Sequence, residues 1–240
     1  MSSGAADAEE NRAHPTGERV PEQSKAENGL RIRAADAYDV NAIARLLVQA
    51  FPSLYSTTFG NLGTQKLTAL LSHLYVVGTL SKETTLVAER EGRIVGLAIL
   101  HFGNSIGRGS VWTFGLLLLR RLNPFQAVRA FFGGLCANAM LDRRIPRAPD
   151  LAYVEALAVA EGERGKGIGT HLLEEALTQA KARGRSRMAL HVLQSNTRAR
   201  HLYERIGFRP WERTPPRRSS GALFSRRASG WSALLLVRPI

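Results

Sequence analysis

Residues 161–170 read EGERGKGIGT and follow the apolar stretch VEALAVA, residues 154–160. Behind Arg164, glycine occupies every second position up to Gly169. Glycine at an ordinary helix start costs stability, because its backbone loses the most conformational freedom on ordering. A strand that runs through such a turn into a helix directs several free backbone N–H groups to one place, where the positive end of the helix adds to the field. The segment therefore predicts an anion site that a diphosphate can approach closely.

Three phosphate-binding patterns compete for this segment. The Walker pattern GxxxxGK[ST] occurs nowhere in the chain. The dinucleotide pattern GxGxxG fails at its last position, because Leu172 stands where the third glycine belongs. The pattern [Arg/Gln]-x-x-Gly-x-[Gly/Ala] fits residues 164–169 at every position. The sequence thus favours the third pattern.

The neighbouring segments extend this third pattern. The strand candidate LAYVEALAV (151–159) precedes it, and residues 196–208 match N-x-x-A-x-x-L-Y-x-x-x-G-F. Earlier in the chain, RIRAADAYDVNAIARLL (31–47) and VAEREGRIVGLAIL (87–100) have the patterns of a strand followed by a helix and of a hairpin. On these motifs the sequence resembles the GNAT (GCN5-related N-acetyltransferase) superfamily. The resemblance implies an α/β fold with a mixed central sheet flanked by helices.

The resemblance covers residues 30–104 and 151–211, and it implies one acetyltransferase domain over residues 30–240. Residues 1–29 have almost no large apolar side chains, so we expect a disordered tail there. Residues 105–150 contain apolar helical patterns with basic residues between two strand candidates, where a compact domain has a short connection. They predict a helical insertion.

Hydrophobic periodicity predicts a mixed α/β sheet covered by helices in the rest of the domain. The expected helices are 39–51, 64–78, 171–183 and 196–206, and the expected strands are 30–35, 84–90, 93–102, 151–159, 187–193, a short piece from 208, and 231–240.

For the cofactor, the resemblance implies acetyl-CoA. Backbone N–H groups of the glycine segment would bind its diphosphate, and the main chain of the strand before it would pair with the pantetheine arm as an added strand does. The N–H of Leu157 would also stabilise charge on the thioester oxygen. Asn196 is expected to cap the helix that it precedes. The implied cofactor-binding residues are Leu157, Val159, Arg164, Gly165, Lys166, Gly167, Gly169, Thr170 and Asn196. The structural alternative is a tight helix start without a ligand, with Arg164 and Lys166 solvated.

Glu155 and Tyr203 are the candidate catalytic residues. Glu155 lies on an otherwise apolar strand, where a buried carboxylate is costly without a task or a partner. It would take the proton of an attacking amine, and a structural salt bridge is the alternative. By resemblance, Tyr203 would protonate the departing thiolate, and packing of its ring in the core is the alternative. His171 and His191 are interpreted as structural. Cys136 lacks a catalytic setting, which agrees with direct transfer in a ternary complex.

Acceptor specificity in the family comes from the connection between the first two helices, here FPSLYSTTFG, residues 51–60. Phe51, Tyr55 and Phe59 are the candidates for an apolar acceptor pocket. The insertion leaves three roles open: a lid, a homodimer face or a patch for a membrane surface. No pattern of residues indicates a metal site.

The formal net charge is +13, and because residues 1–29 carry −3, the remaining residues carry +16. Such charge attracts RNA, acidic lipid or a phosphorylated cofactor, and part of it lies in a basic loop, residues 212–230. No zinc-finger, RNA-recognition or helix-turn-helix signature is present, so nucleic acid is not the expected partner. No run approaches the roughly 18 apolar residues of a membrane span. With one cysteine and no export signal, we expect a cytoplasmic location.

The sequence therefore predicts an acetyl-CoA-dependent N-acetyltransferase that acts on a primary amine of a small molecule or a protein. One alternative is a non-catalytic acyl-CoA-binding module that engages a protein or nucleic-acid partner. Another is a nucleic-acid-associated protein of this fold. The acceptor, the length of the acyl group and the oligomeric state stay open.

Overall fold

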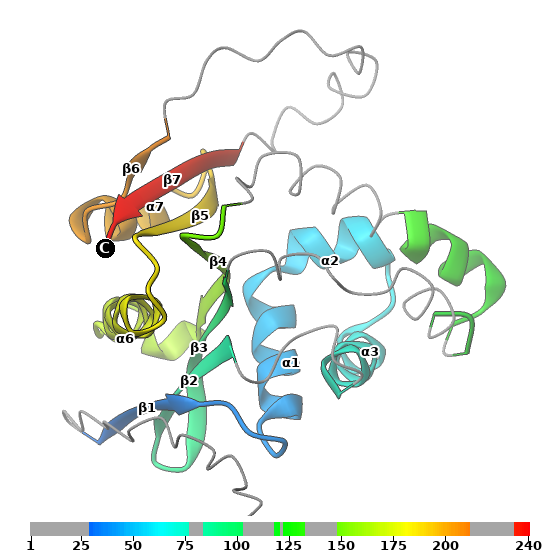
Figure 1. Cartoon of the computed structure of the whole chain (residues 1–240). Coiled ribbons are helices and arrows are strands. Elements are labelled where there is room, and N and C mark those ends of the chain that lie inside the picture. Colours follow the sequence, from blue (N-terminus) through cyan, green and yellow to red (C-terminus); the bar gives the residue numbers. More distant parts are fainter. Residues whose placement is uncertain (1–28, 77–83, 103–117, 121, 133–147, 212–232) are drawn as a thin grey trace, which may run out of the picture.

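The fold is a mixed sheet of seven strands with helices on both faces, as predicted (Figure 1). The computed structural model describes residues 29–76, 84–102, 118–120, 122–132, 148–211 and 233–240. The strands are β1 (Leu30–Ala34), β2 (Thr85–Arg90), β3 (Arg93–Phe102), β4 (Leu151–Val159), β5 (Arg187–Leu193), β6 (Arg209–Pro210) and β7 (Ala233–Pro239). The helices are α1 (Val40–Ala50), α2 (Pro52–Phe59), α3 (Thr64–Val76), α6 (Ile168–Ala182) and α7 (Thr197–Arg205), with a 3₁₀ turn, η3, at Glu161–Glu163.

The strands lie in the order β1-β2-β3-β4-β5-β7-β6. Strands β1 to β4 form an antiparallel series, and β7 is antiparallel to both β5 and β6. Only β4 and β5 run parallel, because α6 carries the chain back across one face of the sheet before β5 begins. The middle of the sheet therefore contains a single parallel junction.

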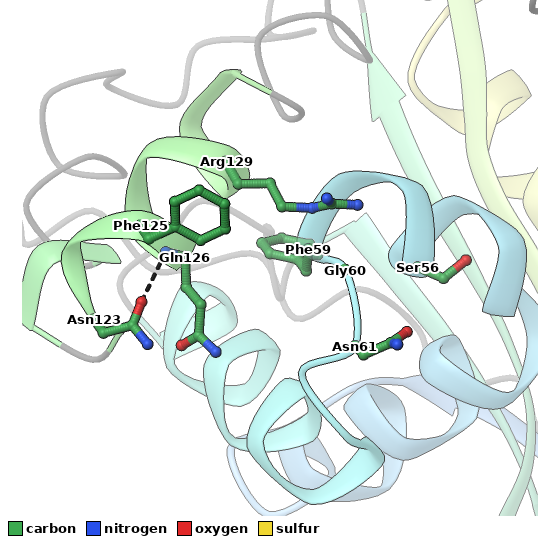
Figure 2. Close-up of a pocket in the computed structure, with 8 residues that line it drawn as sticks. All are labelled: Ser56, Phe59, Gly60, Asn61, Asn123, Phe125, Gln126 and Arg129. Atoms are coloured by element: carbon green, nitrogen blue, oxygen red, sulfur yellow. Dashed lines mark hydrogen bonds between the residues drawn. The ribbon is translucent and has the colours of Figure 1, made fainter.

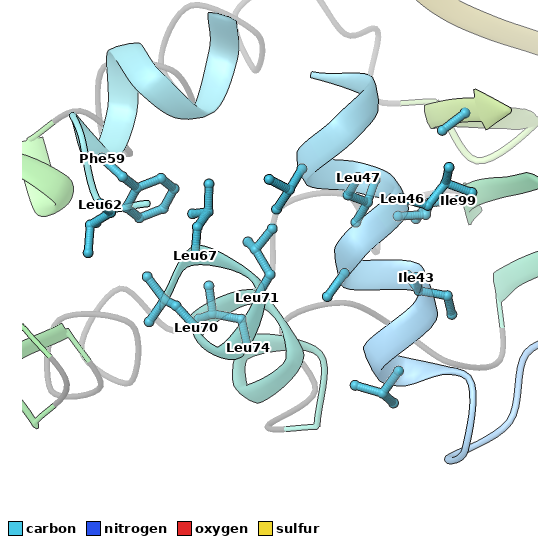
Figure 3. Packing of buried hydrophobic residues seen from close by; sticks show 14 of the residues in the cluster. Ile43, Leu46, Leu47, Phe59, Leu62, Leu67, Leu70, Leu71, Leu74 and Ile99 are labelled. Carbon is cyan, nitrogen blue, oxygen red and sulfur yellow. The ribbon is translucent and has the colours of Figure 1, made fainter. Parts of the chain in front are cut away.

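The core has two layers, one on each face of the sheet. Alternate side chains of β3 point to opposite faces, as a strand requires: Leu97 and Ile99 pack with α1 and α3, whereas Ala98 and Leu100 pack with α6. Figure 3 shows the first layer, in which Ile99 lies beside leucines of α1 and the leucines of α3 pack on the other side of α1. Burial of these side chains against both faces fixes the register of β3, since a slip of one residue would exchange the two faces.

The connection expected at residues 51–60 is instead mostly helical, and this prediction was wrong. Residues Pro52–Phe59 form α2. Proline at the first helical position costs nothing, because its missing N–H would have no partner there. Helix α2 ends at Gly60, whose φ of 70° favours glycine. The short break from α1 at Phe51 turns the chain while both helices stay intact.

The other predicted elements are confirmed to within a few residues where they are described. In the predicted insertion, residues 118–120 and 124–132 are helical, and its other positions up to 147, apart from Leu122 and Asn123, lie outside the described residues, Cys136 among them. The predicted tail, except for Gly29, and the basic loop also lie outside them. No helix in the described part of the chain has the length and apolar character needed to cross a membrane.

Candidate active site

Strands β4 and β5 part in the middle of the sheet. Their parallel pairing runs from Leu151 opposite Arg187 to Val154 opposite Leu190. Beyond that point β4 continues to Val159, while β5 continues to Leu193 paired with β7. The far half of β4 therefore has β3 on one side and, among the described residues, no paired strand on the other, which leaves an open edge.

The open edge of β4 carries the main-chain groups of alternate residues. The N–H of Ala160 donates to the carbonyl of Val95 at 2.9 Å, so residue 160 directs its main-chain groups toward β3. Because main-chain groups alternate in direction along a strand, those of Leu157 and Val159 point away from β3. Consistent with this, the carbonyl of Val159 accepts a hydrogen bond from Arg164 Nε at 3.0 Å. An extended ligand in the gap would meet the Leu157 and Val159 amides.

The glycine segment lies directly after this edge. Gly165 and Gly167 have φ angles of 85° and 82°, in the region that favours glycine, and α6 begins at the next residue. A Cβ on Gly169 would lie 3.2 Å from Leu202 Cδ2, so this glycine allows α6 and α7 to approach closely. The N–H groups of these glycines donate to no described residue, whereas that of Thr170 already donates to the Gly167 carbonyl at 2.9 Å. Three of the four amides expected to bind a diphosphate are thus available at the start of α6.

The predicted cations of this segment are engaged by the protein itself. Besides the bond from Arg164 to Val159, Lys166 Nζ contacts Glu163 Oε1 at 3.0 Å. Glu163 also pairs with Arg90. The hydrogen bond from Lys166, with the charge of Arg90, lowers the pKa of Glu163. Part of the charge of Lys166 is therefore balanced before any ligand binds.

Glu155 lies at an irregularity in β4. Ile99 is opposite Ala156, but Leu100 is opposite Val154, so Glu155 is an extra residue in the strand, a β-bulge. The bulge places Glu155 on the face that Tyr153 and Ala156 share, where α1 and α3 pack. The side chain is 44% exposed, and one of its oxygens contacts Nε2 of His101, which is 13% exposed. A carboxylate reachable from solvent is thus held by a mostly buried imidazole.

His101, near the end of β3, is not among the site residues predicted from the sequence, although its position could have indicated a role. It is opposite Tyr153 in the register, and it ends an apolar run, GLAIL, in which a polar residue stands out. Sequence alone does not show the bulge that brings the neighbouring glutamate to it.

The charge of Glu155 acts on two buried tyrosines, Tyr153 and Tyr55. The Tyr153 hydroxyl lies 3.0 Å from His191 Nδ1, and burial, followed by the charges of Glu155 and Tyr203, raises the pKa of Tyr153. Burial and the Glu155 charge likewise raise the pKa of Tyr55, on α2. His191, interpreted as structural, thus has a tyrosine partner at the junction of β4 and β5.

Tyr203 approaches the same junction from the other face. It belongs to the core layer under α6, and its ring packs edge-on against Phe208 with centroids 6.0 Å apart. Burial raises its pKa to about 12, so the hydroxyl keeps its proton at neutral pH. The hydroxyl has no hydrogen-bond partner among the described residues. Asn196 caps α7 as predicted, because its side chain accepts a bond from the Ala199 N–H at 3.1 Å.

The three aromatic acceptor candidates pack in or against the same core layer, and the rings of Tyr55 and Phe59 lie with centroids 6.2 Å apart. Phe51 packs partly against the core, and Phe59 is buried in it. Of the three, Tyr55 is the residue whose pKa is raised by burial and by the charge of Glu155. An open hollow of about 360 Å³ lies where the end of α2 meets residues 123–129 (Figure 2). Its lining consists of Ser56, Phe59, Gly60, Asn61, Asn123, Phe125, Gln126 and Arg129. The lining includes neither Glu155 nor Tyr203, so the hollow is separate from the parted strands. Among the described residues, no cluster of His, Cys, Asp and Glu could hold a metal ion.

Comparison with known proteins gives short but clear similarities. Over 80 residues the chain is 44% identical to a mycothiol acetyltransferase of Beutenbergia cavernae, which covers 32% of this chain and 25% of that protein. Over 55 residues it is 44% identical to the streptothricin acetyltransferase of Streptomyces lavendulae, covering 23% of this chain and 29% of that protein. The chain thus matches only about a quarter of the length of these curated relatives.

Solved structures match over much more of the chain. A crystal structure of an N-acetyltransferase from Staphylococcus aureus Mu50 superposes with a TM-score of 0.58 at 19% identity, covering 86% of this chain and 99% of that one. Another acetyltransferase crystal structure gives a TM-score of 0.55 at 21% identity, with 87% and 98% covered. These similarities show the fold. The model of the acetyltransferase (GNAT) family matches residues 41–208, and with the sheet and glycine segment described above it shows that the chain belongs to this family.

Proposed function

We propose that this protein transfers an acetyl group from acetyl-CoA to a primary amine by direct attack in a ternary complex. The observation that carries the proposal is the parting of β4 from β5 beside a helix start whose amides have no partner among the described residues. Unpaired N–H groups at a helix start attract a diphosphate, and an open strand edge pairs with an amide-containing arm. Family membership supports the same cofactor, since the family uses acetyl-CoA.

The residues present fit acetyl-CoA. Gly165, Gly167 and Gly169 would hold the diphosphate, and the main chain of Leu157 and Val159 would hold the pantetheine arm. The cofactor, when bound, supplies an acetyl thioester with a thiolate as leaving group. The Leu157 N–H, which points into the gap, would then stabilise negative charge on the carbonyl oxygen. Thr170 would contribute through its side chain rather than its engaged N–H.

Two side chains that flank the gap on opposite faces of the sheet, Glu155 and Tyr203, would move the protons of the reaction. Glu155 would take a proton from the amine, since alkyl amines are mostly protonated at neutral pH. His101 would position the carboxylate through its contact with the same side chain. Tyr203 would give its proton to the departing sulfur from the α6 face as the C–S bond breaks, and the second proton of the nitrogen, lost after the C–N bond forms, would restore the Tyr203 hydroxyl. The separation of β4 from β5 supports this assignment, since a thioester bound in the gap would have Glu155 on one face and Tyr203 on the other.

The acceptor would enter on the face covered by α1 and α2, where Glu155 is exposed. Tyr55 is the best candidate for contacting it, because its hydroxyl lies within the electrostatic reach of Glu155. The relatives are named for mycothiol and streptothricin, and one yeast relative is named N-alpha-acetyltransferase 40, so small-molecule and protein amines both stay open.

Calorimetry with acetyl-CoA, followed by a thiol-release screen over small amines and peptide N-termini, tests the proposal. We expect micromolar binding and turnover with at least one class of amine. Absence of binding would overturn both the enzyme and the acyl-CoA-binding module. Binding without turnover on any amine would favour the non-catalytic module.

A further inference from the structure

Four cations lie near the glycine segment, and among the described residues only Lys166 of the four pairs with a carboxylate. Arg164 and Lys166 belong to the segment and contact Val159 and Glu163. The other two, Arg198 and Arg205, come from α7. An Nη atom of Arg198 lies 3.5 Å from the position that a Cβ on Gly165 would occupy, and an Nη atom of Arg205 lies 3.5 Å from Thr170 Oγ1.

These two guanidinium groups are not balanced by carboxylates. Both residues are exposed, and neither pairs with an acidic side chain in the described part of the chain. Arg200, on the same helix, differs, because it forms an ion pair with Glu204 at 3.6 Å. Two unbalanced positive charges thus face amides that also lack partners, which is a combination suited to a phosphate group.

The geometry of α7 holds the two arginines in this position. Residues 198, 202 and 205 lie on one face of a helix, at spacings of four and three. Leu202, between the two arginines, packs against Gly169, and Asn196 fixes the start of the helix. The contact that only a glycine permits therefore sets how close both guanidinium groups come to the segment.

We propose that Arg198 and Arg205 bind the diphosphate of the cofactor and supply the positive charge that Arg164 and Lys166 cannot supply in full. The inference rests on the proposed function. Both residues occupy x positions of N-x-x-A-x-x-L-Y-x-x-x-G-F, so the motif itself assigns them nothing. Arginine suits the task, because its planar fork donates two hydrogen bonds to a phosphate.

Calorimetry with coenzyme A and with dephospho-coenzyme A, which lacks the 3′-phosphate, tests this assignment. Arg198→Gln is expected to weaken binding of both ligands by about tenfold or more, the effect of losing one charge-assisted hydrogen bond. Arg205→Gln should have the same direction, and both losses should shrink at high salt, which screens exposed charges. Arg200→Gln removes one positive charge from the same helix and is the matched control. It should bind both ligands as the unaltered protein does.

Each outcome has a separate meaning. If the unaltered protein binds neither ligand, the proposed function fails. If it binds and Arg198→Gln binds as tightly as Arg200→Gln, the inference about α7 is overturned while the proposed function stands. A loss seen with coenzyme A alone would overturn the assignment to the diphosphate, because the 3′-phosphate would then be the contact. Thermal unfolding by circular dichroism verifies that all three variants fold alike.

Discussion

The two faces of the parted strands are built in different ways. On the proposed cofactor side, main-chain amides of the segment from β4 into α6 would bind, with glycines giving them their directions, and the side chains proposed to assist them, Arg198 and Arg205, both come from α7. On the acceptor side, the groups are side chains from segments far apart in the chain, such as Tyr55, His101 and Glu155. Main-chain groups keep their positions when non-glycine side chains are exchanged. Substitution of a side chain that contacts the ligand, in contrast, changes which ligand the site can bind. The cofactor side can therefore stay constant while the acceptor side varies.

Removal of the candidate base gives the largest expected effect. Glu155→Gln should lower kcat by about 10²- to 10⁴-fold, the usual contribution of a general base, and leave the affinity for acetyl-CoA unchanged. Steady-state kinetics with calorimetry measure both. Glu91→Gln, in the exposed turn between β2 and β3, is the control. A variant with normal kcat and a lower melting temperature would assign Glu155 to a structural salt bridge instead.

The candidate acid gives the next effect. Tyr203→Phe should lower kcat by about tenfold to 100-fold, near the lower end for acid–base groups. Its raised pKa also affects stability: the unfolded state loses the phenolic proton near pH 10, whereas the folded state keeps it to about 12. The contribution of Tyr203 to the free energy of unfolding should thus be constant below about pH 10 and fall between about pH 10 and 12. Urea titrations across this range should show a smaller fall for Tyr203→Phe, and an identical fall would contradict the buried hydroxyl.

Substitution of a glycine in residues 165–169 tests whether the main chain of this segment binds the cofactor. Gly167→Ala places a Cβ at a φ of 82° and should shift the loop, which lowers the affinity for acetyl-CoA by about tenfold. Gly92→Ala introduces similar strain at a φ of 71° in the turn before β3, where a Cβ meets nothing within 4 Å. Both variants should lose comparable stability, but only the first should lose affinity. Equal calorimetric affinities for the two would remove the segment from the cofactor site.

The positioning of Glu155 by His101 is expected to contribute less. His101→Gln should lower kcat by less than about tenfold, since the carboxylate stays in place but loses its buried partner. The pH profile of kcat separates positioning from packing, because loss of an imidazole contact changes the profile and a packing defect does not. An unchanged profile with a lower melting temperature would assign the contact to stability alone.

The smallest effect is expected on the acceptor side. Tyr55→Phe removes only a hydroxyl near Glu155 and should raise KM for the amine by about two- to fivefold, with the affinity for acetyl-CoA unchanged. Initial rates at varied amine and saturating acetyl-CoA measure this. A larger change in KM for acetyl-CoA than for the amine would show that α2 faces the cofactor.

Features that depend on neighbouring residues could be predicted from the sequence, whereas features that depend on tertiary packing could not. The fold, the glycine segment and the Asn196 cap follow from local patterns, because glycine spacing, strand alternation and capping residues are set by neighbours in the chain. The contact of His101 with Glu155 joins β3 to β4 through a bulge that no local pattern reveals, and α2 was missed because its apolar periodicity is weak. The position of Arg198 depends on how closely α7 approaches α6. These features arise from tertiary packing.

The bulge at Glu155 has a consequence for how β4 can change. A strand of the same length without a bulge would keep strict alternation, so Ala156 and every later side chain would exchange the face of His101 for the face of α6, or the reverse. Deletion of the codon for Glu155 would instead restore regular pairing with β3 and leave the later side chains on their present faces, so that the carboxylate beside His101 would be lost. The length of β4 between Val154 and Leu157 is thus as much a determinant of chemistry as the identity of any residue in it.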